Sequence, residues 1–127
     1  SGIGFENIYH AIAELDGLPA PALSPEQITE RALAGADQLC IRTLEVFCAM
    51  LGTAASNLAL TLGARGGVYV GGGIVPKLGD FFSHSSFRAR FEAKGRRSGY
   101  LAAIPTYVIH AEHPALIGAA QALAAEP

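Results

Sequence analysis

The feature that most constrains this fold is an uncharged run, residues 46–64, within a longer helical pattern. A run of about 20 apolar residues can span a bilayer as a helix, or it can form a helix that is buried on all sides. Polar residues such as Thr53 and Asn57 interrupt the run, and a strand-like segment follows it almost directly. We therefore expect a buried central helix from about Ala36 to Leu62, and no membrane span.

A shorter helix is predicted at the start of the chain. It opens with a turn at residues 1–4 and runs to about Asp16, and its apolar residues recur on one side of a helix. These residues are Phe5, Ile8, Tyr9, Ile12 and Leu15. The proline- and glycine-containing segment that follows, residues 17–23, is predicted to be a linker.

A second short helix has a well-defined start at Ser24. The Ser24 hydroxyl can accept a hydrogen bond from the backbone amide of Gln27, while the Gln27 side chain returns one to the Ser24 amide. Pro25 suits the first helical position. We expect this helix to end near Gly35.

Two segments after the long helix are predicted to be strands, residues 68–70 and 104–110. Between them the pattern predicts a helix at residues 75–82, a second helical stretch that ends at Lys94, and a polar loop at residues 94–99. A last helix is expected from Pro114 to Ala125. Two strands joined through helices form a parallel crossover, but a stable sheet usually needs more than two strands. The remaining strands are therefore expected to come from outside this chain.

Three consecutive glycines, Gly71 to Gly73, separate the first predicted strand from a helix. Backbone without Cβ atoms can lie against a base or ribose, and a helix N-terminus favours negative charge. The alternative is that the glycines only let the chain turn, and spacing alone favours that interpretation. A Walker pattern is absent, and Pro76 stands where a dinucleotide fingerprint needs glycine, which argues against a Rossmann-type NAD site.

Other candidate sites are weaker. The H-A-E-H segment, residues 110–113, lacks an evident third ligand, so no metal site is expected. The K-G-R-R segment, residues 94–97, is expected to be solvated, with contact to a phosphate as the alternative. The net charge of -2 and the absence of Trp give no reason to expect nucleic acid. No residue stands out as a general base.

The cysteines indicate a reducing compartment. Cys40 and Cys48 lie in one helical pattern at a spacing that separates their Cα atoms by about 12 Å, whereas a disulfide needs less than about 7 Å. We expect buried, unreactive thiols. No signal peptide is apparent, and a cytoplasmic location is predicted.

Several segments, spread from Ser1 to Ala120, resemble the bacterial glucokinase family in the family's order. The matching stretches are SGIGFENIYHAI, ITERALAG, TLEVFCAMLG, SNLALTLGARGGVYVGGGIVPKL, FRARFEAKGR and IPTYVIHAEHPALIGAA. The combination of GGVYVGGGIVPKL with FRARFEAKGR is specific. The chain departs from the family at Ile3, where members carry Pro, and at Ala55-Ser56, where members often carry Gly-Gly.

The resemblance implies an α/β fold, the actin-like ATPase (ribonuclease H-like) fold of hexokinase, actin and Hsp70. Residues 1–127 would be the C-terminal portion of the large glucokinase domain, with the small domain and the start of the large domain upstream. Two short parallel strands would belong to an incomplete sheet. In this superfamily a strand–glycine–helix element contacts the adenosine of ATP. The resemblance therefore implies cofactor contacts at Gly71, Gly72, Gly73 and Ile74, with Ser1 and Gly2 lining the same side of the pocket.

The activity implied is phosphorylation of glucose to glucose 6-phosphate by ATP with Mg²⁺, in a homodimer without nucleic-acid or membrane partners. The family's phosphate loop, catalytic Asp and glucose-binding residues lie upstream, so the chain alone is expected to be inactive. The alternative is a non-catalytic regulatory or protein-interaction domain derived from a sugar kinase.

Overall fold

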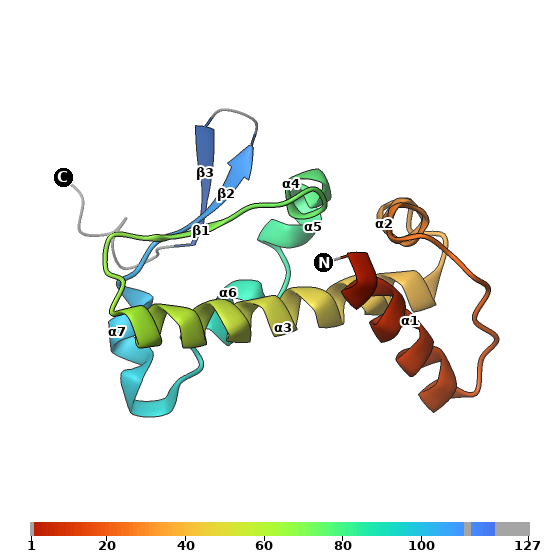
Figure 1. Ribbon diagram of the computed structural model, residues 1–127, viewed down its shortest axis with the longest axis horizontal. Coiled ribbons are helices and arrows are strands. Elements are labelled where there is room, and N and C mark those ends of the chain that lie inside the picture. Colours follow the sequence, from red (N-terminus) through yellow and green to blue (C-terminus); the bar gives the residue numbers. More distant parts are fainter. Residues whose placement is uncertain (1, 111–112, 119–127) are drawn as a thin grey trace. The chain divides into compact units, whose positions relative to one another are not determined.

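A computed structural model describes residues 2–110 and 113–118, and the chain divides into two compact units, residues 1–48 and 49–127 (Figure 1). The first contains helices α1 (Gly2–Asp16) and α2 (Pro25–Leu33) and the start of α3 (Gln38–Leu62). The unit boundary falls within α3, so this helix contributes to both.

The start of α2 confirms the predicted capping box. The Ser24 hydroxyl accepts a 3.1 Å hydrogen bond from the Gln27 amide, and Gln27 Oε1 accepts a 2.8 Å bond from the Ser24 amide. The helix ends at Leu33, two residues before Gly35, whose φ of 71° lets the chain turn. Asp37 then opens α3 by accepting hydrogen bonds from backbone amides of its first turn.

In the core of the first unit, helix α1 contributes the buried side chains of Phe5, Tyr9 and Ile12. Phe5 contacts Phe47 of α3 edge-on, with ring centroids 4.4 Å apart. Two predictions for α1 are wrong. The expected turn at residues 1–4 is already helical from Gly2, and Leu15 is 85% exposed. Helical geometry puts Leu15 about 100° round the axis from the centre of the buried side, which explains its exposure.

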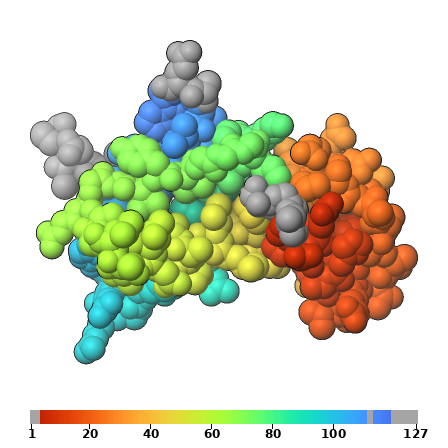
Figure 2. All heavy atoms as spheres, viewed as in Figure 1, coloured from red at the N-terminus to blue at the C-terminus, as the bar shows by residue number. Residues whose placement is uncertain are grey.

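The long helix α3 is confirmed, but its predicted burial on all sides is wrong. In the second unit Met50, Leu58 and Leu62 are 57%, 56% and 70% exposed. Figure 2 shows this half of the helix, yellow to yellow-green, on the surface that faces the viewer. The opposite side, with Gly52, Ala55 and Ala59, is buried. By length and composition α3 is one candidate membrane span in the described part of the chain, which is weak evidence because core helices meet the same criteria.

The second unit contains a three-stranded sheet in the order β1-β2-β3, formed by β1 (Val68–Val70), β2 (Thr106–His110) and β3 (His113–Gly118). The predicted parallel pair is confirmed, with Val68 opposite Thr106. Strand β3 pairs antiparallel to β2, so the expectation of only two strands is wrong and the sheet is mixed.

The predicted helix from Pro114 to Ala125 is therefore wrong over residues 114–118, and residues 119–125 lie outside the described part. Ala115 and Leu116 are helix formers, but here they pair across the hairpin with Val108 and Tyr107. Backbone pairing along the available edge of β2 outweighs a weak local helical preference.

Short helices connect β1 to β2. They are α4 (Val75–Leu78), α5 (Asp80–Ser83), α6 (Phe87–Glu92), the 3₁₀ turn η1 (Gly95–Arg97) and α7 (Ser98–Ala102). The single helix expected at residues 75–82 is broken at Gly79, where φ is 57°. The polar loop expected at residues 94–99 is largely helical instead. Phe82, Phe87 and Phe91 form the buried aromatic core under these helices, with centroids 4.8 and 6.2 Å apart.

Candidate functional site

The three glycines after β1 form an exposed segment that leads into α4. Among them only Gly72 has a positive φ, 115°, a backbone conformation that residues other than glycine rarely adopt. The turn itself therefore accounts for one glycine of the three.

The glycines at 71 and 73 have no such explanation in the fold. A Cβ atom added at Gly73 would meet nothing within 4 Å, and one added at Gly71 would lie 3.5 Å from Ile109 Cδ1, an ordinary contact. Neither residue has a positive φ. Two exposed positions therefore lack side chains although the chain has room for them, and another molecule can approach the backbone closely here.

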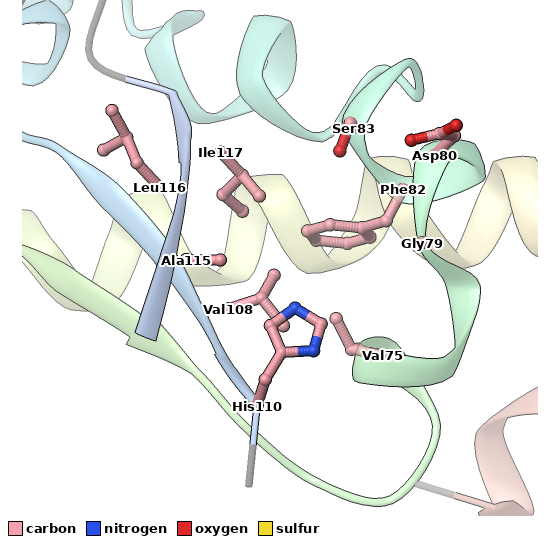
Figure 3. Close-up of a pocket in the computed structure, with 10 residues that line it drawn as sticks. All are labelled: Val75, Gly79, Asp80, Phe82, Ser83, Val108, His110, Ala115, Leu116 and Ile117. Atoms are coloured by element: carbon pink, nitrogen blue, oxygen red, sulfur yellow. The ribbon is translucent and has the colours of Figure 1, made fainter. Parts of the chain in front are cut away.

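A pocket of about 210 Å³ lies beside this segment, between α4–α5 and the strands β2 and β3. Its lining is mainly apolar, with Val75, Phe82 and Val108. Figure 3 shows the Phe82 ring and the His110 imidazole pointing toward one another across it. The volume is below the roughly 300 Å³ of usual ligand pockets, so this hollow holds at most part of a ligand.

The structure places the predicted cofactor-binding residues in two groups. Gly71 to Gly73 and the half-buried Ile74 are consecutive in the second unit. Gly2 begins α1 in the first unit, and Ser1 lies outside the described residues. Helix α4 has only four residues, so its N-terminus carries little helix dipole.

Comparison with known proteins decides the family. The family profile described as Glucokinase matches residues 1–126. This chain belongs to the glucokinase family. The match confirms the resemblance drawn from the GGVYVGGGIVPKL and FRARFEAKGR segments.

Glucokinases from several bacteria are similar over nearly all of this chain. That of Aromatoleum aromaticum is 60% identical over 97% of the chain and 37% of its own length, and that of Chromobacterium violaceum is 56% identical over 98% and 36%. The crystal structure of a glucokinase from an Antarctic psychrotroph superimposes with a TM-score of 0.83 at 39% identity, over 99% of this chain and 39% of that one. The chain thus spans little more than a third of the glucokinases that it matches.

The basic segment of this glucokinase-family chain, residues 94–97, lies between α6 and α7. The Lys94 ammonium donates a hydrogen bond to Asn57 Oδ1, and Arg96 and Arg97 are exposed on η1. Arg65 lies over the Tyr100 ring, 5.7 Å from its centroid. The predicted solvation is confirmed for Arg96 and Arg97, and phosphate contact at Lys94, Arg96 and Arg97 stays an untested alternative.

In the described residues, the histidines and Cys40 give no sign of a metal site or of a reactive thiol. His110 and His113 face one another at the end of the β2–β3 hairpin, and residues 2–110 and 113–118 contain no group of three or more His, Cys, Asp or Glu placed to hold a metal. Burial, helped by the nearby Asp37 carboxylate, raises the pKa of the Cys40 thiol to about 11. Cys40 is therefore protonated and unreactive near neutral pH, as expected.

Sequence reasoning missed the pocket beside the glycines. Phe82 and Val108 are 26 residues apart, and no local pattern signals that α5 and β2 face one another. The crossover between two parallel strands indicates only that helices cover one face of the sheet.

Proposed function

We propose that this chain is part of an ATP-dependent glucokinase that phosphorylates glucose to glucose 6-phosphate, and that residues 71–74 form the adenosine side of its nucleotide site. One observation carries the assignment of the site. Gly71 and Gly73 are exposed and have neither positive φ nor neighbours that exclude a side chain. Contact between the backbone and a flat ligand explains the absence of side chains there, whereas a turn explains only Gly72.

The chain corresponds in this proposal to the C-terminal portion of a large, actin-like domain. The mixed three-stranded sheet with helices along the crossover is compatible with that fold. The phosphate loop, the catalytic carboxylate and the glucose-binding residues belong to the part of the protein that this chain does not span. Since phosphoryl transfer depends on positioning nucleophile, metal and phosphates together, residues 1–127 alone are inactive.

ATP and Mg²⁺ are the cofactors of the proposed whole enzyme. The exposed glycine segment fits the adenosine end of ATP, where close backbone approach matters more than charge. Mg²⁺ prefers carboxylate oxygens and phosphates, and residues outside this chain would hold it. A homodimer and a cytoplasmic location remain expectations from the resemblance.

A chimera tests the proposal. Residues 1–127 replace the matching segment of the Aromatoleum aromaticum glucokinase, and hexose-dependent ADP release is measured with ATP and Mg²⁺. Turnover with glucose is expected, and the chain alone should show none. A folded chimera without turnover on any hexose, beside an active unaltered relative, would contradict the proposal and favour a regulatory or interaction domain.

A further inference from the structure

We propose that the second unit carries a surface that lies on membranes containing anionic lipids. The exposed side of α3 enters the lipid interface, and an adjoining basic cluster contacts the headgroups. The basic cluster consists of Arg65, Lys94, Arg96 and Arg97. Such a contact is independent of the proposed glucokinase activity and departs from the resemblance, which implies no membrane partner.

Charge is divided unevenly along the chain. Residues 1–48 contain two Lys or Arg against seven Asp or Glu, whereas residues 49–127 contain seven Lys or Arg against four Asp or Glu. Among residues 2–110 and 113–118, no ion pair joins any member of the basic cluster to a carboxylate. Four cations without carboxylate partners attract an anionic surface.

Contacts within the second unit bring the basic cluster together at the C-terminal end of α3. The Lys94 ammonium donates a hydrogen bond to Oδ1 of Asn57, an exposed residue of α3. The Tyr100 hydroxyl donates a 3.2 Å hydrogen bond to the Ala64 carbonyl, and the Arg65 guanidinium lies over the Tyr100 ring. Helix α7 therefore lies beside the end of α3 (Figure 1), and the η1 turn joins Lys94 to α7 directly.

An apolar strip on α3 adjoins the basic cluster. Met50, Leu58 and Leu62 are exposed, and residues 46–64 contain no charged side chain. Leu58 is the neighbour of Asn57, the residue that Lys94 contacts. An exposed apolar side with cations at its border is typical of helices that bind in the plane of a membrane interface.

The combination of apolar strip and basic cluster selects a lipid surface. A free phosphate ion or an RNA strand would use the cations and leave Leu58 and Leu62 in water. Arg65 also covers the Tyr100 ring, so this ring is no open platform for a base. Anionic lipids use both features, through their headgroups and their acyl chains. Because Ala59 on the other side of α3 is buried inside the unit, the helix lies on the bilayer and does not cross it.

Co-sedimentation with lipid vesicles tests the surface in the chimera described above. Vesicles of equal parts phosphatidylcholine and phosphatidylglycerol are compared with vesicles of phosphatidylcholine alone. Binding to the anionic vesicles should be at least about tenfold tighter, and it should weaken at about 1 M salt, where charges are screened within about 3 Å. Equal binding to the two kinds of vesicle, or no binding by the folded chimera, would overturn the inference.

Matched variants of the chimera locate the surface. Arg97→Gln should weaken binding to the anionic vesicles about fivefold, whereas Lys77→Gln, which removes an exposed cation from α4, should weaken it less than about twofold. Leu62→Ser should weaken binding about tenfold, with Leu15→Ser, at an exposed position of the first unit, as its control. Arg97 and Leu62 variants that bind as tightly as their controls would overturn the inference, because another part of the chimera would then hold the vesicles.

Further outcomes separate the lipid surface from other ligands and from the proposed function. Displacement of the chimera from the vesicles by inorganic phosphate at constant ionic strength would make free phosphate the ligand and overturn the inference. Binding to single-stranded RNA but to no vesicle would overturn it in favour of nucleic acid. Glucose turnover without vesicle binding contradicts the lipid surface alone. Vesicle binding through the basic cluster without turnover supports the lipid surface and contradicts the glucokinase activity.

Discussion

The Arg88 guanidinium donates a 2.7 Å hydrogen bond from Nη1 to the backbone carbonyl of Ile104, which lies between α7 and β2. Its Nη2 donates to the carbonyls of Leu101 and Ala102, at 3.2 and 3.1 Å. The carbonyls at the end of a helix lack partners within it, so one side chain of α6 satisfies the end of α7 and fixes the chain's entry into β2. Glu92 holds the same guanidinium through a 2.7 Å ion pair.

Replacing Arg88 should therefore destabilise the second unit. Arg88→Ala removes the donor to the carbonyls of Ala102 and Ile104, whereas the Leu101 carbonyl keeps its bond from the Ile104 amide, and the change is expected to lower the free energy of unfolding by about 3 kcal/mol. Arg88→Lys should recover little, because an ammonium cannot reproduce the planar fork. Chemical denaturation measures both, with Arg90→Ala, at an exposed position, as the control. Equal stability of the Arg88 and Arg90 variants would show that the network contributes nothing.

Close packing of α3 against α6 makes Gly52 irreplaceable. A Cβ atom there would lie 2.3 Å from the Phe87 carbonyl oxygen, a distance that requires backbone to move. Gly52→Ala should cost about 3 kcal/mol, although alanine is the better helix former. Gly99→Ala in α7 is the matched control, since its Cβ meets nothing within 4 Å, and it should be neutral or stabilise by up to about 1 kcal/mol. Thermal unfolding of the two variants tests the contrast, and a stable Gly52→Ala protein would refute the packing described here.

Ser56 carries a buried hydroxyl that has no hydrogen-bond partner in the described structure. Removing an unsatisfied buried polar atom relieves its desolvation cost. Ser56→Ala should therefore raise the free energy of unfolding by about 1 kcal/mol, more than Thr53→Ala does at an exposed position of the same helix. Urea denaturation compares the two. A clearly destabilised Ser56→Ala protein would mean that the hydroxyl is satisfied in solution.

Stability should fall at high pH because of Cys40. Burial raises the pKa of this thiol from 9.0 to about 11, so between those values the unfolded chain ionises first and is favoured. The loss should reach about 1.4 kcal/mol per pH unit between pH 9.0 and about 11, and it should be absent below pH 9.0. Burial also raises the pKa of Tyr9, which adds its own loss. Urea midpoints measured across this pH range for the wild type and for Cys40→Ala separate the contribution of Cys40 from that of Tyr9. Identical pH profiles for the two proteins would contradict the assignment to Cys40.

Local interactions and one pairing of distant strands could be predicted from the sequence, and the other contacts between distant segments could not. The Ser24–Gln27 capping box depends on residues three positions apart and was predicted in full. The parallel β1–β2 pair was also predictable, because a crossover of this length leaves few alternatives. Helical periodicity, by contrast, could not show which side of α3 is covered, so the exposure of Leu58 and Leu62 was missed.

For the candidate site, too, the sequence predicts one part and not another. The strand–glycine–helix order of residues 68–78 is visible in the sequence, whereas the backbone angles that separate Gly72 from Gly71 and Gly73 are not. Strand β3 was missed because Ala115 and Leu116 favour a helix locally, and only the edge of β2 makes the extended form favourable.

Kinetics of Gly73→Val in the active chimera tests the central claim most directly. The fold has room for this side chain, so stability should be unchanged, whereas Gly72→Val should be strained at a φ of 115°. If residues 71–74 contact adenosine, Gly73→Val raises the KM for ATP by about tenfold, equivalent to about 1.4 kcal/mol, and leaves the KM for glucose unchanged. An unchanged KM for ATP in the folded variant would contradict the claim, and would mean that the three glycines only turn the chain.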